Sequence, residues 1–178
     1  MATKAKFNWQ SHDIWVLWHQ AGSLTSRTEE AALAPYGVTP QQFAVLIKLK
    51  FADGPVTITD LANETCRNAN TISMLIDRMV KAGLVRRIRN LPDRRALRIT
   101  ITRKGEEKLN LATKPGMKLV DRQLSCFTNE EIRTLVRLLE KLKKKSFEEL
   151  GKEDTTVKTG AKSAQSVERF WAKSDSKA

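Results

Sequence analysis

Polar side chains suited to reading nucleic-acid bases gather in one stretch of the sequence, residues 68–85. Amide and hydroxyl groups recur there on one side of a predicted helix, and such short groups can hydrogen-bond to base edges in a DNA major groove. The solvated face of an ordinary surface helix has a similar composition, so the stretch alone leaves both interpretations open. The candidate DNA-contacting residues are Asn68, Asn70, Thr71, Ser73, Met74 and Arg78.

The same stretch carries the start and stop signals of a single helix. Asn68 can cap it, because its side-chain oxygen can accept a free backbone N–H of the first turn. Gly83 can end it, because the residue just past a helix end often needs a positive φ. Apolar residues between them recur at helical spacing and predict one buried face: Ile72, Leu75, Ile76, Met79 and Val80.

A shorter helix is expected just before this one. Residues 56–58 can pair briefly as a strand, and Thr57 can cap the following helix with Asp60 as its capping-box partner. The turn at residues 66–68 then leads directly into the polar helix. Two short helices joined by so tight a turn are typical of a helix-turn-helix.

An arginine-rich hairpin follows the two helices. Residues 84–90 and 96–102 alternate apolar and polar side chains, and the segment between them has the composition of a turn. Arginine at a hairpin tip suits a narrow minor groove, whose negative potential attracts it, so Arg94 and Arg95 are candidate minor-groove contacts. Asp93 could orient one of them through a bidentate pair. The alternative is an edge hairpin whose charge only protects it from aggregation.

Long helical patterns flank these elements. A helix is expected from about residue 10 to 33, and Thr39 and Gln42 form a capping box for the next one. Beyond the hairpin, a helical region runs to about residue 127, and Pro115 should kink or interrupt it. A last helix, with a capping box at residues 128–131, has an apolar stripe broad enough for both a core and a partner helix.

Aromatic residues concentrate in the first helix and next to the second one. Trp15 and Trp18 pack the core or a subunit seam, or else line a small-molecule pocket together with His19 and Phe43. We expect no metal site, because the two histidines of the chain offer too few ligands.

Composition limits the classes of function. The chain has 178 residues and a net charge of +12, which favours polyanionic partners and nucleic acid first. It has no apolar run long enough to span a membrane and no secretory signal, so a cytoplasmic protein is expected. Cys66 and Cys126 are too few for a disulfide framework, and Cys66 is expected to be a small buried hydrophobe rather than a redox site. No catalytic set or cofactor motif is present, which argues against an enzyme.

Five segments of the chain carry a resemblance to a known family: Thr39-Pro40-Gln41-Gln42-Phe43-Ala44-Val45-Leu46, Leu61-Ala62, residues 77–85, Asp93-Arg94-Arg95-Ala96 and Thr102-Arg103-Lys104-Gly105. Together they resemble the MarR family of bacterial transcription regulators. The resemblance covers about residues 10–150 and implies a mainly α fold with a small β-hairpin: a winged helix-turn-helix flanked by dimerisation helices. Met74 departs from the polar or basic residue common at its position, which suggests contact with a thymine methyl.

The resemblance divides residues 1–150 into three segments. Residues 10–34 and 103–150 would be dimerisation helices, and residues 38–102 the winged-helix DNA-binding region, followed by a flexible basic tail at residues 151–178. A homodimer would then bind double-stranded DNA at a pseudo-palindromic operator, with half-sites roughly 34 Å apart. The expected function is a repressor released by a small apolar or phenolic effector. The alternative is a winged-helix module that binds another protein and no specific DNA.

Overall fold

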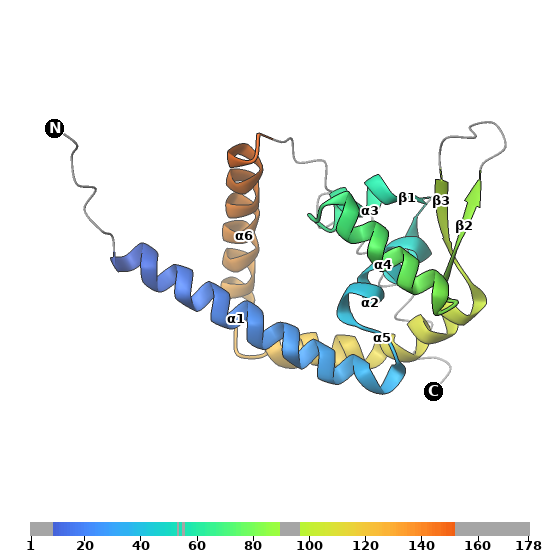
Figure 1. Cartoon of the computed structure of the whole chain (residues 1–178). Helices are drawn as coiled ribbons and strands as arrows, with labels where there is room; N and C mark the ends of the chain where they lie inside the picture. Colours follow the sequence, from blue (N-terminus) through green and yellow to red (C-terminus); the bar gives the residue numbers. More distant parts are fainter. Residues whose placement is uncertain (1–8, 53, 55, 90–96, 152–178) are drawn as a thin grey trace.

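The computed structural model describes residues 9–52, 54, 56–89 and 97–151 (Figure 1). Its helices are α1 (Trp9–Leu33), a short 3-10 turn η1 (Ala34–Tyr36), α2 (Pro40–Phe51), α3 (Ile58–Glu64), α4 (Ala69–Lys81), α5 (Arg103–Leu124) and α6 (Asn129–Glu149). Its strands are β1 (Val56–Thr57), β2 (Val85–Arg89) and β3 (Leu97–Ile101). The expected mainly α winged helix-turn-helix is confirmed.

Local capping signals set where three of the helices begin. The hydroxyl of Thr39 accepts the N–H of Gln42 at 3.2 Å, and the Gln42 side chain accepts the N–H of Thr39 at 3.0 Å. Thr57 and Asp60 make the same reciprocal pair at the start of α3. Thr128 and Glu131 do so at the start of α6. Because these bonds satisfy backbone donors that a helix leaves free, the three predicted capping boxes fix the register of α2, α3 and α6.

The predicted hairpin belongs to a three-stranded antiparallel sheet in the order β1-β3-β2. Val85 pairs with Ile101 and Arg87 with Ile99, while β1 adds Val56 opposite Ile99 on the other side of β3. The central strand therefore carries the buried residue Ile99 between two partners. A two-stranded ribbon alone would be marginal, so the third strand ties the hairpin to the start of α3.

A single core lies beneath the sheet and helices α2 to α5. Its fully buried residues come from every one of these elements, so the winged-helix region is packed as a single unit. The largest of them are Leu46, Leu61, Ile72, Ile76, Met79, Ile99 and Leu109. Helix α5 begins against this unit: a Cβ at Gly105 would overlap the carbonyl oxygen of Leu84, so only glycine allows the approach.

Helix α5 runs without interruption through Pro115 to Leu124, so of the predicted kink or interruption, the interruption does not occur. Proline removes the N–H that would bond the carbonyl of Leu111, four residues earlier. Leu111 is 59% exposed and so lies on the solvent side of α5, where a carbonyl without a helical partner costs less than in the core.

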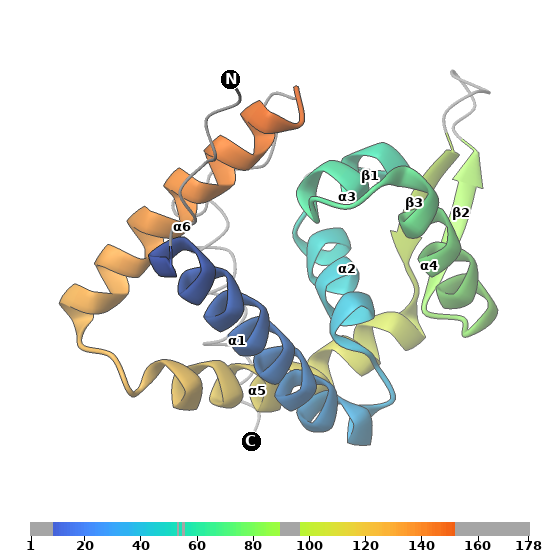
Figure 2. The same ribbon diagram turned by 60° about the vertical axis from the view of Figure 1, so that its left-hand side comes forward.

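Helices α1 and α6 lie on one side of the molecule and the winged-helix region lies on the other, with α5 joining them (Figures 1 and 2). No residue of α6 is buried, and among the described α1 side chains only Leu33 is. The apolar stripe of α6, which was expected to pack against both a core and a partner helix, is therefore not buried in the core of its own chain. Among the described residues, no helix is long and apolar enough to cross a membrane.

Candidate nucleic-acid interface

Helix α4 is held at both ends and along one face. The Asn68 side-chain oxygen accepts the N–H of Thr71 at 2.8 Å, which is the predicted cap. Gly83 has φ +72°, the left-handed conformation expected just past the helix. Ile72, Ile76 and Met79 are fully buried beneath it. The cap, the terminal glycine and the buried face together leave α4 little freedom to shift, so its outer face has a fixed orientation.

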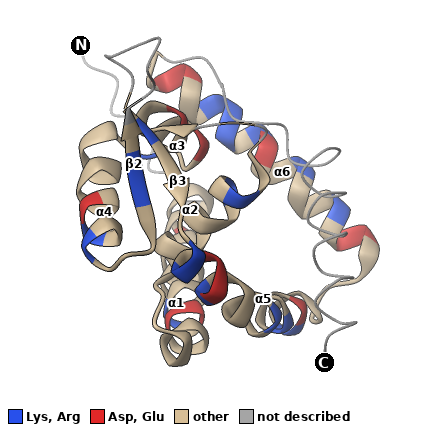
Figure 3. Cartoon of the chain, turned by 90° about the vertical axis from the view of Figure 1, so that its right-hand side faces the viewer, with Lys and Arg blue, Asp and Glu red and all other residues tan. Residues whose placement is uncertain are grey.

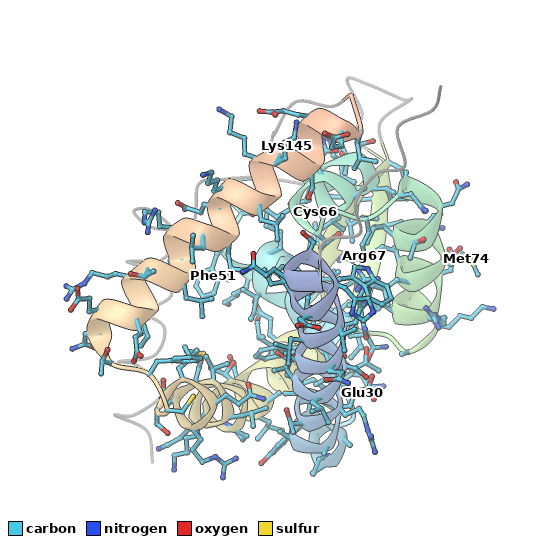
Figure 4. The ribbon with its side chains drawn as sticks, turned by 90° about the vertical axis from the view of Figure 1, so that its left-hand side faces the viewer. Glu30, Phe51, Cys66, Arg67, Met74 and Lys145 are labelled. Carbon is cyan, nitrogen blue, oxygen red and sulfur yellow. The ribbon has the colours of Figure 1, made fainter. Side chains whose placement is uncertain are left out.

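The outer face of α4 is where the sequence pattern placed it, with one difference. Val80 was expected on the buried stripe but is 37% exposed, because it lies at the edge of the helix's contact with the core. Asn70 and Met74, one turn apart, lie at the centre of the outward face, and Met74 is 66% exposed. Figure 4 shows the Met74 side chain extending outward from α4. An exposed thioether among amides and hydroxyls gives this face one apolar contact point.

Two of the candidate residues are engaged within the cap itself. The Thr71 hydroxyl donates to the Asn68 side-chain oxygen at 2.7 Å, in addition to the N–H bond. That hydroxyl keeps lone pairs that can accept from another group, and the amide N–H₂ of Asn68 can still donate. Ser73 is half-buried, on the side of α4 opposite Thr71. The exposed candidates at the helix start are therefore Asn68, Asn70 and Thr71.

A hollow of about 330 Å³ opens on one side of α4, between its first turns and the N-terminus of α2. Of the described residues that line it, two carry guanidinium groups and none a carboxylate. Among the described residues, no ion pair is formed by Arg67 or Arg78, so their charge is available to a ligand. The lining residues are Thr39, Gln41, Gln42, Arg67, Thr71, Leu75 and Arg78.

This hollow has the properties of a site for an oxyanion. Planar guanidinium groups present paired donors that match phosphate geometry, and the hydroxyl and amide groups beside them add further donors. Sequence patterns identified Arg78 but missed Arg67, which precedes the cap of α4, and missed Gln41 and Gln42 as well. Only the placement of the start of α2 beside the first turns of α4 brings these residues together, so no local signal could have identified the set.

The base of the hairpin lies on the other side of α4. A guanidinium nitrogen of Arg87 on β2 is 2.8 Å from a carboxylate oxygen of Asp77 on α4. Arg86 on the same strand donates to the hydroxyl of Thr100 at 3.2 Å. Figure 3 shows β2 beside α4, with basic positions on the strand and both charges on the helix. The predicted tip residues Asp93, Arg94 and Arg95 lie outside the described residues.

The candidate ligand-pocket residues are divided between two places. The rings of Trp15 and His19 are in contact, with centroids 4.6 Å apart, and Trp15 and Trp18 are 60% and 50% exposed. Trp15 and Trp18 therefore do not pack the core of their own chain. Phe43 lies beside Gly116, as does Leu33 at the other end of α1. At about 1.5 Å per residue, that places Phe43 roughly 20 Å along α1 from Trp18.

The cysteines differ from the sequence-based expectation in one respect. Cys66 is exposed rather than buried, and it has φ +52° in the turn between α3 and α4. The tight turn requires that left-handed residue, and it directs the side chain away from the core. No group of three or more histidine, cysteine or acidic side chains that could hold a metal occurs among the described residues.

Comparison with known proteins links this geometry to one family. A model of the MarR family matches residues 36–96, from the end of η1 to the hairpin. The uncharacterized HTH-type transcriptional regulator YsmB of Bacillus subtilis (strain 168) is 32% identical over 117 residues, which are 64% of this chain and 80% of that protein.

Two solved structures share the fold. The organohalide-sensing RdhR-CbdbA1625 transcriptional regulator in its 2,4-dichlorophenol-bound form superposes with a TM-score of 0.78 at 21% identity, over 90% of this chain and 98% of that one. A mutant of MarR from E. coli in complex with operator DNA superposes with a TM-score of 0.70 at 24% identity, over 78% of this chain and 99% of that one.

Proposed function

This chain belongs to the MarR family, and from that premise we propose that it is a homodimeric repressor that binds a pseudo-palindromic operator. The observation that carries the proposal is the outer face of α4, which presents Asn70 and Met74 between a hollow lined by the guanidiniums of Arg67 and Arg78 and a basic hairpin. Members of this family are DNA-binding transcriptional regulators. The dimer, the operator symmetry, the sign of regulation and the effector are the features that we propose.

The dimer is supported by apolar surface that its own chain leaves uncovered. On α6, Val136, Leu138, Leu139 and Leu142 are between 41% and 49% exposed. On α1, Ile14 and Leu17 are 66% and 63% exposed. Large apolar side chains exposed in such number on two helices are typical of an interface between proteins. We therefore propose that α1, α5 and α6 join two copies and that Trp15 and Trp18 lie in or beside that seam.

The proposed DNA contacts follow from the order of residues around α4. Asn70 and Met74 face outward and would meet base edges in the major groove, with Asn68, Thr71 and Ser73 at the start of the helix beside them. Met74 would contact a thymine methyl. Arg78 and Arg67 would hold a backbone phosphate in the hollow. Two copies related by a two-fold axis would present their α4 helices to half-sites about one helical turn, roughly 34 Å, apart.

The hairpin would supply the minor-groove contacts. Arg94 and Arg95 are the proposed residues, with Asp93 orienting one of them, and this element of the proposal rests on sequence. The net charge of +12 would add long-range attraction to the DNA backbone and speed the encounter. Repression is proposed because a dimer that covers adjacent grooves of an operator excludes other proteins from the same DNA.

Release by an apolar or phenolic effector completes the proposal. Its support is the exposed aromatic surface of Trp15 and Trp18, in contact with His19, on a helix that would border the dimer seam. Phe43 marks a second apolar place, beside Gly116, where α1, α2 and α5 meet. A ligand at either place would change the spacing of the arms and hence of the two α4 helices. The solved relative bound to 2,4-dichlorophenol makes chlorinated phenols the first compounds to test.

Selection from a library of random-sequence duplexes with the full-length protein tests the function. We expect enrichment of a sequence with two-fold symmetry, and an affinity for it that falls steeply as salt rises, because phosphate contacts release counterions. The DNA upstream of the gene for this chain should contain a related sequence. No enrichment, together with no measurable affinity for any duplex at low salt, would favour the protein-interaction module instead.

A further inference from the structure

A carboxylate on the outer side of α4 requires an explanation if that helix meets DNA. Asp77 is the sole acidic residue between Asn68 and Gly83, and it lies one turn after Ser73, on the side of the helix that faces β2. A free carboxylate at that place would repel backbone phosphates. In this chain, a carboxylate oxygen of Asp77 lies 2.8 Å from a guanidinium nitrogen of Arg87.

The pair joins two elements that would each contact DNA. Arg87 lies in the middle of β2, where register pairing with Ile99 of the central strand fixes its backbone. Asp77 lies in the third turn of α4, whose opposite face is fully buried. The ion pair therefore ties the outer edge of the helix to the strand that leads to the arginine-rich tip. The Asp77 side chain is 50% exposed and the Arg87 side chain 31%, so the ion pair adds little to folding stability.

We propose that Asp77 and Arg87 form a positioning pair that determines how strongly the protein prefers its operator over other DNA. The proposal rests on the proposed function as a DNA-binding repressor. The pair has two effects. It holds the hairpin base at one distance from α4, so that base contacts and minor-groove contacts are made together. It also keeps the Arg87 guanidinium from binding phosphates, which occur in every sequence and carry no specificity.

The two effects give Asp77→Asn a signature that loss of structure would not give. The change removes a negative charge and frees Arg87, so affinity for DNA of unrelated sequence should rise. Affinity for the operator should stay level or fall, because the hairpin is no longer held to α4. We expect the ratio of operator to unrelated affinity to drop about tenfold, since specificity is the difference between these two affinities.

The experiment compares affinities for the duplex that the wild type selects and for a scrambled duplex of equal length and composition. The variants are Asp77→Asn, Asp77→Glu, which keeps the charge, and Arg87→Gln. Glu106→Gln is the matched control, because it breaks the Lys50–Glu106 pair, which has the same 2.8 Å length and similar exposure but joins α2 to α5. Thermal melting of each variant reports whether the fold is retained.

For Asp77→Asn, we expect a lower ratio of operator affinity to scrambled-duplex affinity, with stronger binding to the scrambled duplex. For Asp77→Glu and Glu106→Gln, we expect this ratio to stay close to the wild-type value. Arg87→Gln should lower the ratio by weakening operator binding, because the hairpin is then no longer held to α4, while the unpaired Asp77 carboxylate repels both duplexes alike. An unchanged ratio for Asp77→Asn would overturn the positioning role, and so would an equal drop for Glu106→Gln. A wild type that prefers neither duplex would instead contradict the proposed function itself.

Discussion

Replacing Arg78 by glutamine should reduce how steeply DNA affinity falls with salt. The size of that reduction also shows how many copies of the protein bind one operator. The guanidinium of Arg78 lines the hollow beside α4 and has no carboxylate partner among the described residues, so it is free to contact a phosphate. Glutamine keeps hydrogen-bonding capacity but removes the charge. Each lost phosphate contact should lower the slope of log affinity against log salt by about 0.9 in magnitude.

A two-fold dimer carries the change twice, so the slope should fall by about 1.8. Between 50 and 200 mM salt, each phosphate contact accounts for roughly a 3.5-fold loss of affinity. The variant should therefore lose about 12-fold less affinity over that range than the wild type does. Fluorescence anisotropy with a labelled operator duplex at four or five salt concentrations measures both slopes. Arg67→Gln should reduce the slope in the same direction if both guanidiniums hold phosphate.

The control is Arg122→Gln, which removes the same charge from the last turn of α5, on the far side of the molecule from α4 (Figure 1). Its slope should match that of the wild type. A slope for Arg78→Gln equal to that of Arg122→Gln would refute the phosphate contact. A reduction of about 0.9 would mean one contact per complex, which would refute binding by two equivalent copies.

Four further predictions concern stability, its pH dependence, assembly and base contact. Thr57→Ala should lower the free energy of unfolding by about 1 kcal/mol in urea titrations. Hydrogen bonds from Thr57 hold the pKa of Asp60 below its ordinary value of 3.8, so the stability difference between wild type and Asp60→Asn should be complete above that pH and vanish as the pH falls further. Leu139→Asp should weaken the dimer by roughly 1–3 kcal/mol, because the 41% of each Leu139 side chain that its own chain leaves exposed is lost from the interface twice, and sedimentation should reveal monomers. Replacing operator thymines by uracil should weaken the wild type but leave Met74→Ala unaffected.

Much of the fold could be predicted because its signals are local. Thr39, Thr57 and Thr128 each bond a residue three positions further on, so a capping box is readable from four residues. Gly83 was predictable for the same reason, since the end of a helix next to a hairpin needs a left-handed residue. The alternation on both sides of the hairpin predicted β2 and β3 because one face must be buried.

The site could be predicted only in part, because its decisive contacts join distant elements. The polar face of α4 follows from helical spacing. Arg67 gains its role from α2, which comes 16 or more positions earlier in the chain, and Asp77 gains its role from a strand that follows. Cys66 was expected to be buried on grounds of residue type and Val80 on grounds of helical spacing. A tight turn and the edge of a packing contact leave them exposed.

The most direct test of the account is a hydroxyl-radical footprint of the full-length protein on its selected operator. Two copies with α4 in successive major grooves should protect two-fold symmetric segments of backbone, with centres about one helical turn apart. Arg78→Gln should weaken this protection symmetrically at both half-sites. A single asymmetric protected segment, or symmetric segments whose spacing does not match the helical repeat of DNA, would contradict the proposed dimeric arrangement.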